Sequence, residues 1–421
     1  MSVRFSHLDQ AVEYLLTYSP EKQSGETYTL ERMKELMSRL GNPQNDIPAV
    51  HVAGTSGKTS TCYYIRALLQ AHGVRTGLTA SPHISSITER VQIDGAPLAD
   101  AVFIAYLERF LDLIEPWNDL RPTYFELLTA FAFWVFKQER VDWMVVEVGL
   151  GGLLDATNVM VGEKKVCVIT PIGLDHTQVL GTTVAEIARQ KAGIITSESM
   201  VFLAMQHPDA DAVVRAVAAD QRASLHTVDR EIESTNGHPA FQRRNFALAH
   251  DVVEHIVREY GYASAKGDTG SLIDQSPPGR FELYEAEGKR IILDGAHNPQ
   301  KLAAFLEALY ARFDGPFTWV VGFVSAPDSK IDECVEMIAD ESDEYIATQF
   351  TVGQDIKGRQ SIGADDLVSR LSRNGVTVRS EQDAEAALRQ ALKMKQRTVV
   401  VTGSLYLVAA LRPKLEELMA T

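Results

Sequence analysis

The segment that decides the fold runs from Val50 to Ser60 and reads VHVAGTSGKTS. An apolar strand, predicted over 49–53, leads into its glycines, and a helix is predicted from about Lys58 to Ala71. Glycines in such a turn let backbone N–H groups approach a phosphate, and the positive end of the helix dipole favours the negative charge. Strand, turn and helix together predict a phosphate-binding loop rather than an ordinary glycine turn.

The residues of this turn carry separate expectations. Lys58 is expected to reach the β- and γ-phosphates of ATP, and the Thr59 hydroxyl is expected to bind Mg²⁺. The common GxxxxGK[ST] spacing is not met, because Val52 stands where the first glycine should be. The shorter form that remains assigns nucleotide binding to Gly54, Thr55, Ser56, Gly57, Lys58, Thr59 and Ser60.

Beyond the loop, apolar runs alternate with amphipathic stretches, which predicts an α/β fold with a mostly parallel sheet. A segment rich in Gly, Ser, Asp and Pro, 264–279, predicts a boundary between a nucleotide-binding domain (1–275) and a smaller Rossmann-like α/β domain (276–421). The predicted strands are 49–53, 77–79, 143–148, 166–170, 201–204, 280–285, 290–293, 319–321, 344–348, 376–379 and 398–401. The predicted helices are 58–71, 100–114, 124–137, 240–260, 300–312 and 383–394.

Composition excludes several classes of protein. The formal net charge is −15, which argues against nucleic acid as a partner. The chain has no run of 18 apolar residues, so we expect no membrane span. Three widely spaced cysteines without a CxxC pair fit reduced thiols in the cytoplasm better than disulfides or a zinc site.

Polar side chains follow three further predicted strands, where parallel sheets hold their ligands. Ser81, Glu147 and His176 lie at these strand ends, and Glu147 is suited to Mg²⁺ that accompanies a nucleotide. Each has an alternative: Ser81 as a helix cap, or His176 as a hydrogen-bonded structural histidine. Lys191 lies on a predicted helix, where the residues alone indicate a solvated surface lysine.

The motifs taken in order resemble the folylpolyglutamate synthase/dihydrofolate synthase family of the Mur ligase superfamily. The resemblance covers nearly the whole chain and rests on LERM (30–33), LGNP (40–43), VAGTSGKTS (52–60), SPH (81–83), ERVQIDG (89–95), TYFE (123–126), EVGLGGLLDATN (147–158), IGLDH (172–176), LGTT (180–183), KAGI (191–194), PGRFE (278–282), LDGAHNP (293–299) and GSLYL (403–407).

This resemblance implies an ATP-dependent ligase that joins L-glutamate to a pterin or folate carboxylate, as a monomer using ATP and two Mg²⁺ ions. It implies catalytic roles for Lys58, Lys191 and His297, with Lys191 carbamylated to hold a second Mg²⁺. It implies metal ligation by Thr59, Ser81, Glu147 and His176, and nucleotide contacts from Asn245, Arg280 and Asp294. The pteroate pocket would lie at Leu154, Asp155 and Ala156.

Some residues depart from the family pattern. Leu153 replaces an arginine beside the expected folate pocket, and Gln190 replaces a glutamate before Lys191. These departures leave open a different pterin or another carboxylate as acceptor.

Three other functions would each explain part of the sequence. A peptidoglycan Mur ligase would need a domain ahead of the loop, but only about 50 residues precede Gly54. A small P-loop kinase would not explain the second domain. A nucleotide-gated regulatory protein would bind ATP without glutamate-dependent turnover.

Overall fold

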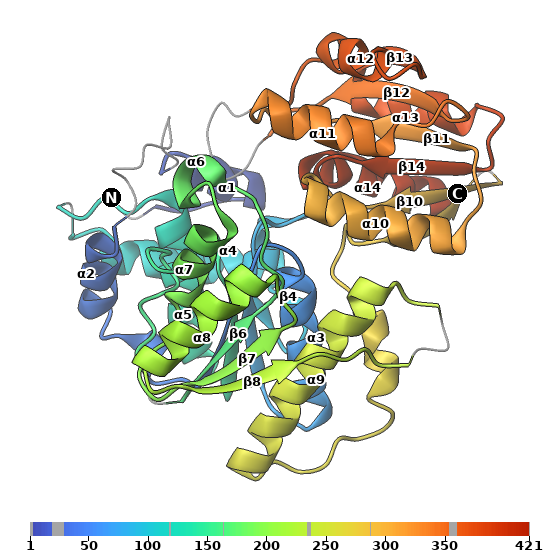
Figure 1. Cartoon of the computed structure of the whole chain (residues 1–421). Helices are drawn as coiled ribbons and strands as arrows, with labels where there is room; N and C mark the ends of the chain where they lie inside the picture. Colours follow the sequence, from blue (N-terminus) through green and yellow to red (C-terminus); the bar gives the residue numbers. More distant parts are fainter. Residues whose placement is uncertain are drawn as a thin grey trace. The chain divides into compact units, whose positions relative to one another are not determined.

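The computed structural model describes residues 3–18, 29–117, 119–162, 164–233, 237–286, 288–352 and 360–420. The chain divides into two compact units, Met1–Ser276 and Pro277–Thr421 (Figure 1). The boundary expected after residue 275 lies beside this division.

The first unit is built on an eight-stranded sheet in the order β4-β3-β2-β5-β1-β6-β7-β8. The neighbouring strands β2, β5, β1, β6, β7 and β8 pair in parallel. At one edge of the sheet, β3 pairs antiparallel with both β2 and β4. This confirms the mostly parallel sheet predicted from the sequence. The strands are β1 (Ala49–Ala53), β2 (Thr76–Thr79), β3 (Gln92–Ile93), β4 (Ala96–Pro97), β5 (Trp143–Glu147), β6 (Lys165–Ile169), β7 (Met200–Ala204) and β8 (Ser224–Val228).

Helices cover both faces of this sheet because the central strands are apolar on both sides. On β5, Met144 and Val146 join a core with α5, while Trp143 and Val145 face α3 and α9. Figure 1 shows α3 and α9 side by side. The helices are α1 (Leu8–Leu16), α2 (Glu31–Arg39), α3 (Lys58–Ala71), α4 (Asp100–Ile114), α5 (Tyr124–Gln138), α6 (Thr177–Leu180), α7 (Val184–Ala192), α8 (Pro208–Asp220) and α9 (Ala240–Tyr260), with short 3₁₀ turns at Pro43–Asn45, Ile87–Arg90 and Gly270–Asp274.

The second unit has a six-stranded sheet in the order β13-β12-β11-β14-β10-β9. All its pairs are parallel except the hairpin of β9 and β10. The strands are β9 (Glu282–Ala286), β10 (Lys289–Leu293), β11 (Phe317–Val321), β12 (Glu344–Gln349), β13 (Thr377–Asp383) and β14 (Thr398–Thr402). The helices are α10 (Pro299–Arg312), α11 (Asp328–Ile338), α12 (Ala364–Ser372), α13 (Ala384–Leu392) and α14 (Leu405–Ala420).

Two differences from the sequence predictions have local causes. The strand predicted to begin at Arg280 begins at Glu282, because Phe281 has a positive φ of 52° and donates its N–H to Asp294. Strand β8 is not predicted from the sequence, because only Val228 of its five residues is buried and its apolar content is low.

Two other expectations concern the chain as a whole. Among the described helices, none is long and apolar enough to cross a membrane. Cys62, Cys167 and Cys334 are buried and form no disulfide.

Candidate active site

The turn between β1 and α3 can be made only with glycine at two places. A Cβ on Gly54 would lie 1.8 Å from Thr170 Oγ1, and Gly54 has a φ of 153°. A Cβ on Gly57, with a φ of 85°, would lie 2.5 Å from Asn245 Oδ1. The loop is therefore pressed between the end of β6 and helix α9, and the buried Asn245 lies directly against it.

Part of the loop is tied to the neighbouring strand end. The N–H groups of Thr55 and Ser56 both donate to Pro171 O, at 3.0 and 3.1 Å. The Thr55 hydroxyl donates to Gly173 O at 3.0 Å and accepts from Gly173 N at 3.1 Å. These two residues, predicted to bind nucleotide, hold the 171–173 turn in place. The N–H groups at the start of α3 lack a partner within the helix and remain suited to phosphate.

Two predicted catalytic lysines meet at one carbonyl oxygen. Lys58 Nζ donates to Gly54 O at 3.1 Å, and Lys191 Nζ donates to the same oxygen at 2.7 Å. Lys191 is only 5% exposed on α7, so the alternative of a solvated surface lysine is wrong. The structure thus brings together residues that lie 137 positions apart in the chain.

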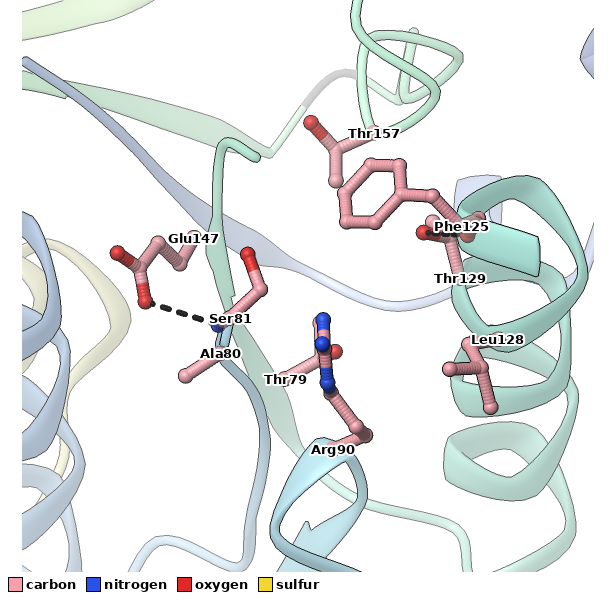
Figure 2. A pocket seen from close by; sticks show the side chains of 9 residues that line it. All are labelled: Thr79, Ala80, Ser81, Arg90, Phe125, Leu128, Thr129, Glu147 and Thr157. Carbon is pink, nitrogen blue, oxygen red and sulfur yellow. Dashed lines mark hydrogen bonds between the residues drawn. The ribbon is translucent and has the colours of Figure 1, made fainter. Parts of the chain in front are cut away.

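Three of the predicted metal ligands also meet. Glu147, at the end of β5 and 3% exposed, accepts from Thr59 Oγ1 at 2.9 Å and from Ser81 N at 3.2 Å (Figure 2). The described residues hold no group of three or more His, Cys, Asp and Glu side chains that could hold a metal. One carboxylate with hydroxyl oxygens suits Mg²⁺, which keeps several waters and takes its remaining ligands from nucleotide phosphates.

His176 is placed by the turn that Thr55 holds. It has a positive φ of 51°. Non-glycine residues seldom adopt this conformation, and it is frequent at functional sites. Its side chain is 47% exposed, with Nε2 at 3.9 Å from Asp175 Oδ2. The histidine is accessible at the carboxyl edge of the sheet, where the sequence predicted it.

The loop after β5 is held by the predicted substrate residue Asp155. Its buried carboxylate accepts from Leu150 N at 2.8 Å, Thr157 N at 3.0 Å and Thr157 Oγ1 at 2.5 Å. Because the Thr157 hydroxyl donates to Asp155, it accepts from His51 Nε2, 2.8 Å away. Burial lowers the pKa of His51 well below its usual value, so this ring is neutral.

The three predicted substrate residues therefore differ in their surroundings. Asp155 supports the loop from inside, and burial raises its pKa despite these hydrogen bonds. Ala156 is buried, whereas Leu154 is 44% exposed and offers an apolar contact at the surface.

A pocket opens beside Glu147. In Figure 2 the Arg90 side chain extends into this space from below, and the Phe125 ring extends into it from helix α5 at the right. Arg90 is buried, and its Nε donates to His83 Nδ1 at 3.1 Å. Burial, with the charge of Arg90, lowers the pKa of His83 to about 2, so His83 is the acceptor. The pocket is lined by Thr79, Ala80, Ser81, Arg90, Phe125, Leu128, Thr129, Glu147 and Thr157.

Arg90 and Phe125 lie in the motifs ERVQIDG and TYFE, but the sequence does not predict a role for either. Thr157 and Thr170 were also missed. Their importance depends on contacts with Asp155 and Gly54 that a single sequence does not reveal. Phe125 also lies at the start of the helix predicted over 124–137, and neither its position nor that of Arg90 by itself indicates a pocket.

The second unit carries the remaining predicted residues, Arg280, Asp294 and His297. Asp294 is buried at the end of β10 and accepts from Phe281 N at 2.9 Å and Ala296 N at 2.8 Å. Burial raises its pKa to about 6, although the charges of Arg280 and Lys301 act in the opposite direction. His297 follows, with Nδ1 at 2.8 Å from Gly295 O.

This raised pKa predicts a pH dependence of stability. The folded chain retains the Asp294 proton to a higher pH than the unfolded chain, so its contribution is full below pH 3.8 and is lost as the pH rises through about 6. We expect the free energy of unfolding of wild type, relative to Asp294→Asn, to fall by about 3 kcal/mol across this window. Urea unfolding of both proteins at several pH values measures the difference. If the free energies of unfolding of the two proteins changed in parallel with pH, the raised pKa of Asp294 would be contradicted.

Comparison with known proteins gives the same family from sequence and structure. A Mur ligase middle domain model matches residues 52–256, and a dihydrofolate synthetase C-terminal domain model matches residues 280–414. The chain is 32% identical over 417 residues to the dihydrofolate synthase/folylpolyglutamate synthase of Bacillus subtilis, covering 92% of this chain and 95% of the relative. It is 30% identical to the folylpolyglutamate synthase of Lacticaseibacillus casei, covering 96% and 98%.

Solved structures extend the match. E. coli FolC in complex with DHPP and ADP superposes with a TM-score of 0.82 at 28% identity, covering 98% of each chain. The bifunctional folylpolyglutamate synthase/dihydrofolate synthase of Yersinia pestis, complexed with AMPPNP and Mn ion, gives 0.81 at 30% identity, covering 99% of this chain and all of the other. From these matches across both units, the chain belongs to the folylpolyglutamate synthase/dihydrofolate synthase family.

Proposed function

We propose that this protein is an ATP-dependent ligase that adds L-glutamate to a folate-type carboxylate through an acyl phosphate. The observation that carries the proposal is the direct link between the phosphate loop and the pocket: Glu147 accepts from Thr59 of the loop and also lines the pocket with Arg90. A phosphate donor and a carboxylate acceptor bound on either side of Glu147 would be neighbours.

The reaction follows from the weakness of a carboxylate as an electrophile. An acceptor carboxylate oxygen attacks the γ-phosphorus of ATP, and ADP leaves. The amine of glutamate then attacks the acyl carbon, phosphate leaves, and the nitrogen loses a proton. Lys58 and the N-terminus of α3 stabilise negative charge on the transferred phosphoryl group, which is the main catalytic contribution in such reactions.

The pocket is small, and its lining suits the anionic end of an acceptor rather than a whole aromatic ring system. The Phe125 ring offers a stacking or edge contact, and the Arg90 guanidinium can hold a carboxylate through paired hydrogen bonds (Figure 2). Leu154, on the loop after β5, would add an apolar contact for a pterin.

Mg²⁺ fits the oxygen donors that meet at Glu147. We infer that Thr59, Ser81, Glu147 and His176 hold the metal, and that Lys191 holds a second ion once it is carbamylated. When bound, the metal neutralises charge on the phosphate oxygens. Asn245, Arg280 and Asp294 are proposed to bind the nucleotide, and His297 to take part in catalysis. We further propose a monomer in the cytoplasm.

The carbamate proposal predicts the behaviour of one variant. Lys191→Ala should lower kcat by about 100-fold, because the carboxylate that carbamylation adds to Lys191 is lost, and with it the site of the second Mg²⁺ ion. Formate or acetate should restore part of the activity by supplying the missing carboxylate. Phosphate release with and without these anions is the measurement. Full activity of the variant without added anion would remove the carbamate proposal.

The proposed function is tested by phosphate release from Mg·ATP with and without L-glutamate. Dihydropteroate, tetrahydrofolate and no acceptor are compared, and the product is weighed by mass spectrometry. Release that needs both glutamate and one pterin, with a product heavier by one glutamyl residue, supports the proposal and names the acceptor. Release with neither pterin would indicate another carboxylate, the alternative that Leu153 leaves open.

A further inference from the structure

A histidine lies inside the central strand of the first unit's sheet. On β1, Val50 and Val52 pack with α3 and α9, so His51 points to the opposite face of the sheet. It is fully buried, and β5 and β6 pair with β1 on either side of it. The loop that follows β5 reaches this face, and Thr157 Oγ1 lies 2.8 Å from His51 Nε2. A polar contact therefore joins the middle of the sheet to this loop.

The positions of the hydrogen atoms follow from the carboxylate of Asp155. The Thr157 hydroxyl donates to Asp155 Oδ1, so it accepts from His51 Nε2, and Nδ1 of the neutral ring is left as an acceptor. In the part of the chain that the structure describes, this buried Nδ1 has no hydrogen-bond partner. A buried acceptor without a partner costs free energy, whereas an apolar side chain of similar volume would fill the space without that cost. The stability of the sheet therefore does not account for an imidazole here.

Thr157 carries this contact to the pocket. It lines the pocket together with Glu147, whereas His51 and Asp155 do not. Figure 2 shows the Thr157 hydroxyl oxygen directed away from the other labelled side chains. The two hydrogen-bond partners of this hydroxyl thus hold the side chain from behind and fix the atoms that it presents to the pocket.

The next residue holds the loop on another side. Asn158 Nδ2 donates to Gly193 O at 2.9 Å, at the end of α7, and to Leu153 O at 3.1 Å within the loop. These bonds do not involve His51. Loss of the His51 contact should therefore loosen the Thr157 side chain without releasing the whole loop.

We propose that His51 is a positioning residue for the acceptor: by holding Thr157, it fixes the wall of the pocket that the loop after β5 supplies. This rests on the proposed function, in which the pocket receives the acceptor carboxylate. A wall that moves would bind the acceptor less tightly, because a site depends on the residues that lock its lining in place. Nucleotide binding is assigned to other residues, so the affinity for ATP should not depend on this contact.

The test measures the KM for dihydropteroate, tetrahydrofolate and ATP by phosphate release. His51→Met removes the donor and should raise the KM for the acceptor about 10-fold, as expected when one buried hydrogen bond is lost. The KM for ATP should change little. A merely structural defect in β1 would also reach Gly54, three residues further along the chain, and would raise the KM for ATP. His51→Gln can place an amide nitrogen near the position of Nε2 and should keep the acceptor KM close to that of wild type.

A second variant tests whether His51 acts through the threonine. Thr157→Val keeps the shape of the side chain but removes both of its hydrogen bonds, so it should raise the acceptor KM at least as much as His51→Met does. The double variant should match Thr157→Val alone, because the two substitutions remove the same contact.

Thr76→Val is the matched control. Thr76 is buried on β2 of the same sheet, and its hydroxyl has no hydrogen-bond partner among the described residues. Its KM values should equal those of wild type. Thermal unfolding of each variant checks that the fold is intact, and Thr157→Val carries the test if His51→Met does not fold.

An unchanged acceptor KM in folded His51→Met would overturn the inference. An equal rise in the KM for the acceptor and for ATP would also overturn it, since His51 would then only support β1. Effects of His51→Met and Thr157→Val that multiply in the double variant would show that His51 does not act through Thr157. Absence of turnover that depends on glutamate and a pterin in wild type would contradict the proposed function itself and is distinguishable from these results.

Discussion

Replacing Glu147 with glutamine should lower kcat for glutamate-dependent phosphate release by about 1000-fold, as expected when one preorganised electrostatic group is removed. The carboxylate accepts from Thr59 and from Ser81, so it holds the loop against the end of β2. Glutamine has a similar shape but lacks the charge, and its amide nitrogen cannot accept from Ser81 N–H. Steady-state rates over a range of Mg²⁺ concentrations measure the effect, and the Mg²⁺ needed for half-maximal rate should rise.

Glu254→Gln is the control for this change. Glu254 lies on α9 of the same unit and is exposed, so the substitution alters the net charge equally. Its rate and Mg²⁺ dependence should match those of wild type. If Glu147→Gln kept its rate and its Mg²⁺ dependence, Glu147 would be a structural residue of the strand end and not part of a metal site.

Gly54→Ala should also lower the turnover rate, by about 100-fold. The added Cβ would meet Thr170 Oγ1 at 1.8 Å and the Thr170 carbonyl oxygen at 2.9 Å, so the loop must shift. The Gly54 carbonyl that both lysines contact would move with it, and a displacement of about 1 Å in such a site costs about 100-fold in rate. We expect the affinity for ATP to fall at least as much, measured by isothermal titration calorimetry.

Two variants separate the close contact from the backbone conformation. Gly73→Ala places a Cβ at another positive φ, 80°, where nothing lies within 4 Å, and should leave ATP binding intact. Adding Thr170→Ala to Gly54→Ala removes the nearest atom and should restore part of the affinity. If Gly54→Ala bound ATP as tightly as wild type does, the close approach of residue 54 to Thr170 would not be needed for nucleotide binding.

The sequence predicts helices and strands well where the spacing of apolar residues matches the period of the element that buries them. Helix α9 has the predicted bounds, because Phe246, Val252, Val253 and Ile256 recur on one face and are buried. Strand β1 is buried throughout and has its predicted bounds. Strand β8 lies at the sheet edge, where exposed residues leave only a weak pattern, and it was missed.

The site was predictable in part. Residues at strand ends could be expected to converge, and Thr59, Ser81 and Glu147 do so. The burial of Lys191 was not predictable from its own helix, because its partner Gly54 lies in a distant part of the chain. The support of Asp155 by Thr157 was equally hidden, although they are only two residues apart, because short spacing does not specify which polar groups turn inward.

The shared use of the Gly54 carbonyl has a consequence for the thermodynamics of nucleotide capture. Lys58 and Lys191 both donate to this oxygen, so each ammonium has a fixed partner in the main chain. A phosphate bound by Lys58, as proposed, would replace one oxygen partner with another, so little side-chain entropy would be lost on binding. Nucleotide binding at this loop should therefore carry a smaller entropic cost than binding at a loop whose lysine is fully solvated.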